Sequence, residues 1–220
     1  AYEIGTGDWS SDVCSSDLDW VVDIGPGAGE QGGKVMSNGT LAALLGAKES
    51  RPTLAAASAL GVPVFVHPQS DPELHKRFSL TGRIGVRLAR GTVNSAALIN
   101  MLESGAFDEI PKLQLVVTTL AFGGVLLAGG FGDGQCIRSD APALTRRHVY
   151  IDTMGLNPAV IRAAVDILGP DHVLMGTDWP IVEEKSVPER LQKAFAHAAL
   201  SPAEQQMIAS GNTLKLLGVS

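Results

Sequence analysis

The sequence predicts an α/β fold in which helices cover a parallel sheet, and two observations lead to this class. From about Arg51 onward, short apolar runs alternate with longer amphipathic runs. The short runs are apolar throughout, which is typical of strands that are buried on both faces. Four strand–helix units suit half of a (β/α)8 barrel of the TIM type, or a small doubly wound sheet. A whole barrel needs roughly 250 residues, so a barrel in residues 51–220 would be incomplete.

The first two units occupy residues 53–119. The run TLAAASALG, residues 53–61, is expected to be a helix that ends at Gly61, and VPVFVHP, residues 62–68, a buried strand. Residues 91–107 are amphipathic, with a helix N-cap expected at Thr92 or Asn94. The run LQLVVTT, residues 113–119, is the second buried strand.

The last two units carry clearer helix signals. Residues 148–153 and 172–176, HVYIDT and HVLMG, are expected to be strands. Between them, Asn157 and Pro158 form a good N-cap and first-turn pair for a helix that ends at Gly169. Residues 186–200 and 201–212 are expected to be helices, the second with a capping box of Ser201 and Glu204.

Composition excludes several classes of protein. The chain has 220 residues, of which 45% are hydrophobic, so a buried core is available. The formal net charge of −6 argues against a nucleic-acid partner. We expect no membrane span and no signal peptide, and a cytoplasmic location is the default. Cys14 and Cys136 lie in no Cys/His cluster, so a cysteine zinc site is not expected.

Polar side chains follow each of the four expected strands. His67 ends the first strand, Thr119 the second, Asp152 the third and Asp178 the fourth. Chemistry in parallel α/β folds lies at the carboxyl ends of strands, so these residues should share one rim. Imidazole and carboxylate suit a divalent metal such as zinc, which could activate a bound water.

Structural roles remain open for the same residues. His67 could simply close its strand before Pro68, and Asp178 could cap the following turn in the sequence DWP. Asp152 could accept hydrogen bonds or cap a helix rather than bind a metal. The remaining histidines, His75, His148, His172 and His197, are expected to be structural or at the surface.

Five motifs in order carry a family resemblance over residues 51–220. VPVFVHP, PKLQLVVTT, HVYIDT, GPDHVLMGTDWP and GNTLKLLG together resemble the amidohydrolase-related metal-dependent hydrolases and decarboxylases, which include aminocarboxymuconate-semialdehyde and resorcylate decarboxylases. The resemblance implies the C-terminal half of a (β/α)8 barrel, a divalent metal, often zinc, and a small, in some members aromatic, carboxylate substrate. It assigns His67 and Asp178 as metal ligands, and we also take Asp178 as the candidate catalytic residue.

The sequence departs from that family pattern at two places. The His-x-His pair of the family's first strand occurs nowhere in the chain, and Thr119 stands at about the position of a catalytic His. Threonine cannot exchange protons near pH 7 as imidazole does. We therefore expect this chain to be inactive or very weakly active. A non-catalytic barrel relative that lost its metal is the alternative.

The first 50 residues have a different texture. Residues 19–50, with the pattern DIGPGAGxxGG, resemble a short stretch of the damage-recognition ATPase of the bacterial excinuclease ABC, a DNA-repair system. A fragment of that ATPase is thus a further alternative, although no Walker-type phosphate loop occurs. The local alternative is a Gly-rich β-hairpin with VVDIG and GKVMSNG as its arms.

Residues 1–18 carry no expected domain. Asp8–Leu18, DWSSDVCSSDL, can be encoded by a common sequencing-library adapter, so we interpret the chain as a chimera. Its expected parts are residues 1–18 from adapter, as a disordered or irregular extension, residues 19–50 from the ATPase, and residues 51–220 as the partial barrel. Half a barrel has open strand edges, and self-association into a homo-oligomer would fit this architecture.

Overall fold

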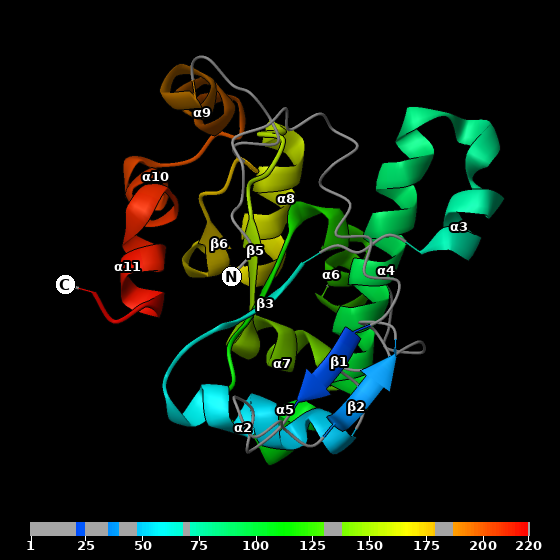
Figure 1. Ribbon diagram of the computed structural model, residues 1–220. Helices are drawn as coiled ribbons and strands as arrows, with labels where there is room; N and C mark the ends of the chain where they lie inside the picture. The colour runs from blue at the N-terminus through cyan, green and yellow to red at the C-terminus, as the bar shows by residue number, and fades with distance from the viewer. Residues whose placement is uncertain are drawn as a thin grey trace, which may run out of the picture.

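A four-stranded parallel sheet forms the centre of the computed structural model, which describes residues 21–24, 35–39, 48–67, 71–129, 138–178 and 187–219. The sheet order is β3-β4-β5-β6, so neighbours in the chain are neighbours in space (Figure 1). The strands are Val64–Val66, Leu115–Val117, Val149–Asp152 and Val173–Leu174. Four parallel strands joined through helices are half of an eight-stranded barrel, which confirms the predicted fold class.

The register of the sheet aligns the strand ends. Val66 lies opposite Val117, Val117 opposite Ile151, and Ile151 opposite Val173. Because all four strands are parallel, the residues that follow them emerge at the same edge of the sheet, which we call the rim.

Helices connect the strands and cover the sheet. The α-helices are α2 (Arg51–Ala59), α3 (Pro72–Arg77), α4 (Arg83–Glu103), α5 (Ala106–Glu109), α6 (Phe122–Gly129), α7 (Ala141–His148), α8 (Pro158–Leu168), α9 (Val187–His197), α10 (Pro202–Gln206) and α11 (Asn212–Leu216). Short 3-10 turns lie at η1 (Lys48–Ser50), η2 (Ser79–Thr81), η3 (Thr119–Ala121) and η4 (Pro170–His172), and a π-helical turn, η5, spans Met207–Gly211.

The core lies between the sheet and the helices α4, α6 and α8. Leu98, Met101 and Leu102 of α4 are fully buried, and they belong to one cluster with Val117 and Ile151 of the sheet. Each such side chain contributes about 1.5–3 kcal/mol when it leaves water. This packing fixes α4 against the strands and thereby sets the position of its polar residues.

The N-cap expected at Thr92 or Asn94 is wrong, because α4 already begins at Arg83. Both residues lie inside the helix, where the Thr92 hydroxyl donates to the Leu88 carbonyl. Gly85 and Gly91 weaken the helical pattern of this segment in the sequence. Gly91 is needed for packing, since a Cβ there would lie 2.8 Å from the carbonyl oxygen of Leu120.

The caps expected further along the chain are confirmed. The Asn157 side chain accepts hydrogen bonds from the backbone of Ala159 and Val160 at the start of α8. Ser201 and Glu204 form the expected reciprocal capping box at α10. The helices α3 and α7 were not expected, although Asp71 caps α3 with Pro72 in its first turn.

Two buried histidines connect the strands at the edge opposite the rim. His148 Nδ1 lies 2.8 Å from the Leu113 carbonyl oxygen, and His172 Nδ1 lies 2.8 Å from that of Val149. The His148 ring stacks on Phe107, with ring centroids 4.5 Å apart. The structural role expected for these two histidines is confirmed, and burial lowers the pKa of His148.

The chain before the barrel segment forms the hairpin expected from its two arms. Strand β1 (Val21–Ile24) pairs antiparallel with β2 (Val35–Gly39) in a separate sheet. Residues 1–18 and Cys136 lie outside the described residues.

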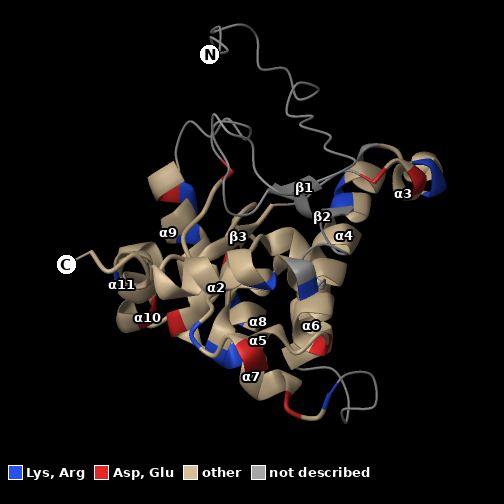
Figure 2. Cartoon of the chain, turned by 60° about the horizontal axis from the view of Figure 1, so that its bottom comes forward, with Lys and Arg blue, Asp and Glu red and all other residues tan. Residues whose placement is uncertain are grey.

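Charged residues of both signs are interspersed over the helices. In Figure 2, short acidic and basic segments are scattered among uncharged residues over the described part of the chain, and helix α3 carries both. No helix within the described ranges is long and apolar enough to cross a bilayer.

Candidate active site

The rim brings together the polar residues that follow the four strands. His67 follows β3, Thr119 lies two residues after β4, Asp152 ends β5, and Asp178 follows β6. His67 and Asp178 are exposed, whereas Thr119 and Asp152 are half-buried. The sequence placed these groups at strand ends, and the register places those ends at one edge.

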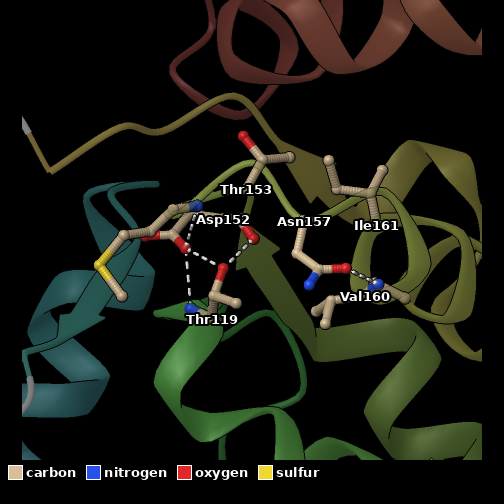
Figure 3. Close-up of a pocket in the computed structure, with 8 residues that line it drawn as sticks. Thr119, Asp152, Thr153, Asn157, Val160 and Ile161 are labelled. Carbon is tan, nitrogen blue, oxygen red and sulfur yellow. Dashed lines mark hydrogen bonds between the residues drawn. The ribbon is translucent and has the colours of Figure 1, made fainter. Parts of the chain in front are cut away.

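Thr119 and Asp152 form the best-defined contact of the rim. The Thr119 backbone N–H donates to Asp152 Oδ1 over 2.8 Å, and its hydroxyl lies 2.6 Å from the same oxygen and 2.7 Å from the Asp152 carbonyl (Figure 3). The Met154 N–H also donates to Oδ1, over 3.1 Å. Thr119 therefore orients the Asp152 carboxylate, which agrees with the accepting role considered for Asp152.

The segment that follows β6 passes close to Asp152. The Thr153 hydroxyl lies 3.2 Å from the Gly176 carbonyl and accepts from the Gly176 N–H at 3.1 Å. A Cβ at position 176 would lie 3.0 Å from Asp152 Cβ and 3.5 Å from its Oδ2. A side chain at position 176 would thus press on the Asp152 side chain, and the second carboxylate oxygen of Asp152 lies on this side of the site.

Several charged groups at the rim act on the carboxyl group of Asp178. Partial desolvation raises the pKa of its carboxyl above the usual value, and the charge of Asp152 raises that pKa further. The charges of His67 and Arg90 act in the opposite direction on the same pKa. The backbone φ of Asp178 is +63°, a left-handed conformation that Asp and Asn tolerate better than most residues. Residues 179–186, including the turn that Asp178 could cap, lie outside the described residues.

Helix α4 contributes two rim residues that the sequence did not assign. The side chain of Asn94 is fully buried, and its amide donates to the Val66 carbonyl over 3.0 Å, directly before His67. Arg90, one helical turn earlier, acts on Asp178 through its charge. Polar residues at the 3.6-residue period of an otherwise apolar helix face were the available signal.

A small hollow opens beside the contact between Thr119 and Asp152. It is lined by Thr119, Asp152, Thr153, Met154, Asn157, Val160, Ile161 and Ala164 (Figure 3). Its walls leave no room for the centre of a water molecule. The hollow by itself is therefore too small to hold a ligand.

The donor groups fit only part of a metal shell. Within the described ranges, no group of three or more His, Cys, Asp or Glu side chains is arranged to hold a metal ion. His67 and Asp178 have the right chemistry, but a catalytic zinc site has three protein ligands. The residues that the structure describes therefore supply only part of such a site.

Fold and rim together define a barrel-type α/β protein whose polar groups gather at the carboxyl ends of parallel strands. The family model described as amidohydrolase matches residues 26–219. The chain thus belongs to the amidohydrolase family. The match begins within the Gly-rich segment, before Arg51.

Solved structures with a similar fold include several decarboxylases. A dihydroxybenzoic acid decarboxylase from Polaromonas sp. JS666, with bound manganese, is 19% identical at a TM-score of 0.66, over 79% of this chain and 55% of that one. A putative amidohydrolase from Staphylococcus aureus is 20% identical at a TM-score of 0.65, over 80% and 60% of the two chains. The chain thus spans somewhat more than half the length of these structures.

Short sequence matches point to a different protein. A UvrABC system protein A from Mycobacterium leprae is 66% identical over 32 residues, which are 14% of this chain and 3% of that protein. The Streptomyces coelicolor protein of the same name is 48% identical over 56 residues, 24% of this chain and 5% of its own length.

Proposed function

We propose that the chain derives from a metal-dependent hydrolase or non-oxidative decarboxylase that acts on a small carboxylate, aromatic carboxylates included. The observation that carries this proposal is the shared rim, where the sheet register gathers His67, Asp152 and Asp178 at one edge. Amidohydrolase membership and the similarity to aromatic-acid decarboxylases support it.

His67 and Asp178 are the proposed metal ligands, and Asp178 is also the proposed catalytic residue. A divalent metal would supply polarisation of a substrate oxygen. Because two side chains hold such an ion weakly, we expect little or no turnover from this chain. Zinc is the metal expected from the ligand types, and manganese is the metal bound in a structure of similar fold.

A binding protein without a metal is the second candidate. Its support is Thr119, whose hydroxyl and N–H are both engaged with Asp152. A threonine held in this way orients a neighbour and does not exchange protons with a substrate.

The chimeric origin is also a proposal. The short matches to UvrABC system protein A support a foreign segment next to the partial barrel. We place its boundaries near residues 18 and 50, although the amidohydrolase match begins at residue 26 and overlaps it. The full reading frame upstream of Arg51 tests it. A continuous amidohydrolase gene there would refute the chimera.

The decisive experiment measures metal content and turnover together. Mn²⁺ and Zn²⁺ binding is measured by calorimetry on the unchanged chain, His67→Gln and Asp178→Asn, with exposed His197→Gln as the control. We expect weak binding that both rim variants abolish and the control retains. Asparagine tolerates the left-handed backbone of residue 178, so a folding defect is avoided. Stoichiometric metal with measurable decarboxylation of 2,6-dihydroxybenzoate would overturn the expected inactivity.

A further inference from the structure

The inner face of helix α4 leads from the core to the rim. Its residues Ala97, Leu98 and Met101 are fully buried, and Asn94 on the same face donates to the Val66 carbonyl at the end of β3. After α4 the chain passes through α5 to the start of β4, so α4 runs antiparallel to the strands. Moving toward its N-terminus therefore means moving toward the rim.

Arg90 is the next residue on this face. It precedes Asn94 by four positions, which is about one turn and about 5–6 Å along the helix axis. The next residue, Gly91, packs so closely on Leu120 that a Cβ would lie 2.8 Å from its carbonyl oxygen. Leu120 directly follows Thr119, so this turn of α4 is held against the rim. Arg90 is half-buried there.

A positive charge at this place would offset the repulsion between the carboxyl groups of the rim and an anionic ligand. Asp152 and Asp178 bring two carboxyl groups to the rim, and a carboxylate ligand that approaches them would be repelled. Arg90 brings a positive charge to this region, because it lies one helical turn beyond Asn94 on the inner face of α4 and is half-buried there. A guanidinium offers two parallel N–H donors that match a carboxylate.

We propose that Arg90 binds the carboxylate of the ligand at the rim and so sets the specificity of the site for anionic substrates. This inference rests on the proposed function, which requires a carboxylate substrate. Arg90 would hold the carboxylate end, while the opposite end of the ligand faces His67 and Asp178.

The test compares two probes on Arg90→Gln, Arg90→Lys and the unchanged chain. The probes are 2,6-dihydroxybenzoate and resorcinol, which is the same ring without the carboxylate, and their affinities are measured by calorimetry or NMR titration. Lys112→Gln is the matched control, because Lys112 is an exposed cation near the start of β4, at the opposite edge of the sheet. Urea midpoints verify that each variant is folded.

Arg90→Gln is expected to weaken 2,6-dihydroxybenzoate binding by about tenfold or more. The affinity for resorcinol should be unchanged. Arg90→Lys should recover part of the lost affinity for 2,6-dihydroxybenzoate. The control Lys112→Gln should bind this ligand as tightly as the unchanged chain. Mn²⁺ titrated alone should bind Arg90→Gln more tightly, because a positive charge near Asp178 is gone. A purely structural role of Arg90 would weaken binding of both the anion and the cation.

The outcomes separate this proposal from the proposed function. If the unchanged chain and Arg90→Gln bind 2,6-dihydroxybenzoate equally, or if the unchanged chain does not bind it, the role of Arg90 is refuted. If carboxylate binding depends on Arg90 but Mn²⁺ does not bind, the role of Arg90 stands and the metal-dependent function fails.

Discussion

Replacing Thr119 by valine removes one hydroxyl from the rim and keeps the shape of the side chain. The hydroxyl lies 2.6 Å from Asp152 Oδ1 and 2.7 Å from the Asp152 carbonyl, and its single hydrogen serves one of them at a time. A hydrogen bond to a charged group contributes about 1.5–3 kcal/mol. Since the rim is only half-buried and two backbone N–H groups still bind Oδ1, we expect a loss of about 1.5 kcal/mol.

Urea denaturation measures this loss as a lower midpoint with an unchanged m-value. Thr119→Ser, which keeps the hydroxyl, should stay within about 0.5 kcal/mol of the unchanged chain. Combining Thr119→Val with Asp152→Asn tests the pair directly, with a coupling energy of about 1 kcal/mol expected. Additive effects of the two substitutions, or a Thr119→Val protein as stable as the original, would show that Thr119 does not orient Asp152.

Other parts of the fold carry three further predictions. Because burial lowers the pKa of His148, the unfolded chain binds protons more readily, so stability should be complete above pH 6.5 and decrease below it. Urea midpoints from pH 8 to 5 measure this, and a pH slope unchanged in His148→Gln would contradict it. Asn212 is 4% exposed and donates to the carbonyls of Pro170 and Val173. Asn212→Ala should therefore lower the free energy of unfolding, measured by urea denaturation, by about 1–3 kcal/mol. A smaller loss would mean that water replaces these hydrogen bonds. Phe65 on the edge strand β3 is 67% exposed, so the chain should self-associate through this edge. Phe65→Lys should reduce the self-association measured by light scattering. A monomeric unchanged chain would refute the expectation.

The edge strands explain why self-association is expected through β3 rather than β6. At β6, the Met175 N–H donates to the Ile208 carbonyl, and Asn212 donates to the Val173 carbonyl, so backbone groups here have partners within the chain. At β3, in the part of the chain that the structure describes, the strand pairs with β4 only. Leu60 and Val62, just before β3, are also exposed, at 77% and 48%.

Local chemistry made much of the fold predictable from the sequence. Apolar runs of strand length, Asn157 before Pro158 and the Ser201–Glu204 pair act through neighbouring residues, so their effect can be read without a tertiary structure. The start of α4 could not be read in this way, because Gly91 lowers helix propensity and is present for close packing on Leu120. Helix α3 was missed although Asp71 and Pro72 carry the same signal as Asn157 and Pro158.

The sequence by itself determined the class of fold and the residue types at the strand ends, including His67 and Asp178. The tertiary structure decided which of these groups act on one another. The bonds between Thr119 and Asp152 join residues 33 positions apart, and Arg90 on helix α4 acts on Asp178, which follows strand β6. Such contacts depend on sheet register and on the rotation of a helix about its axis. Both are set by side-chain packing across the whole core, which no local pattern in the sequence records.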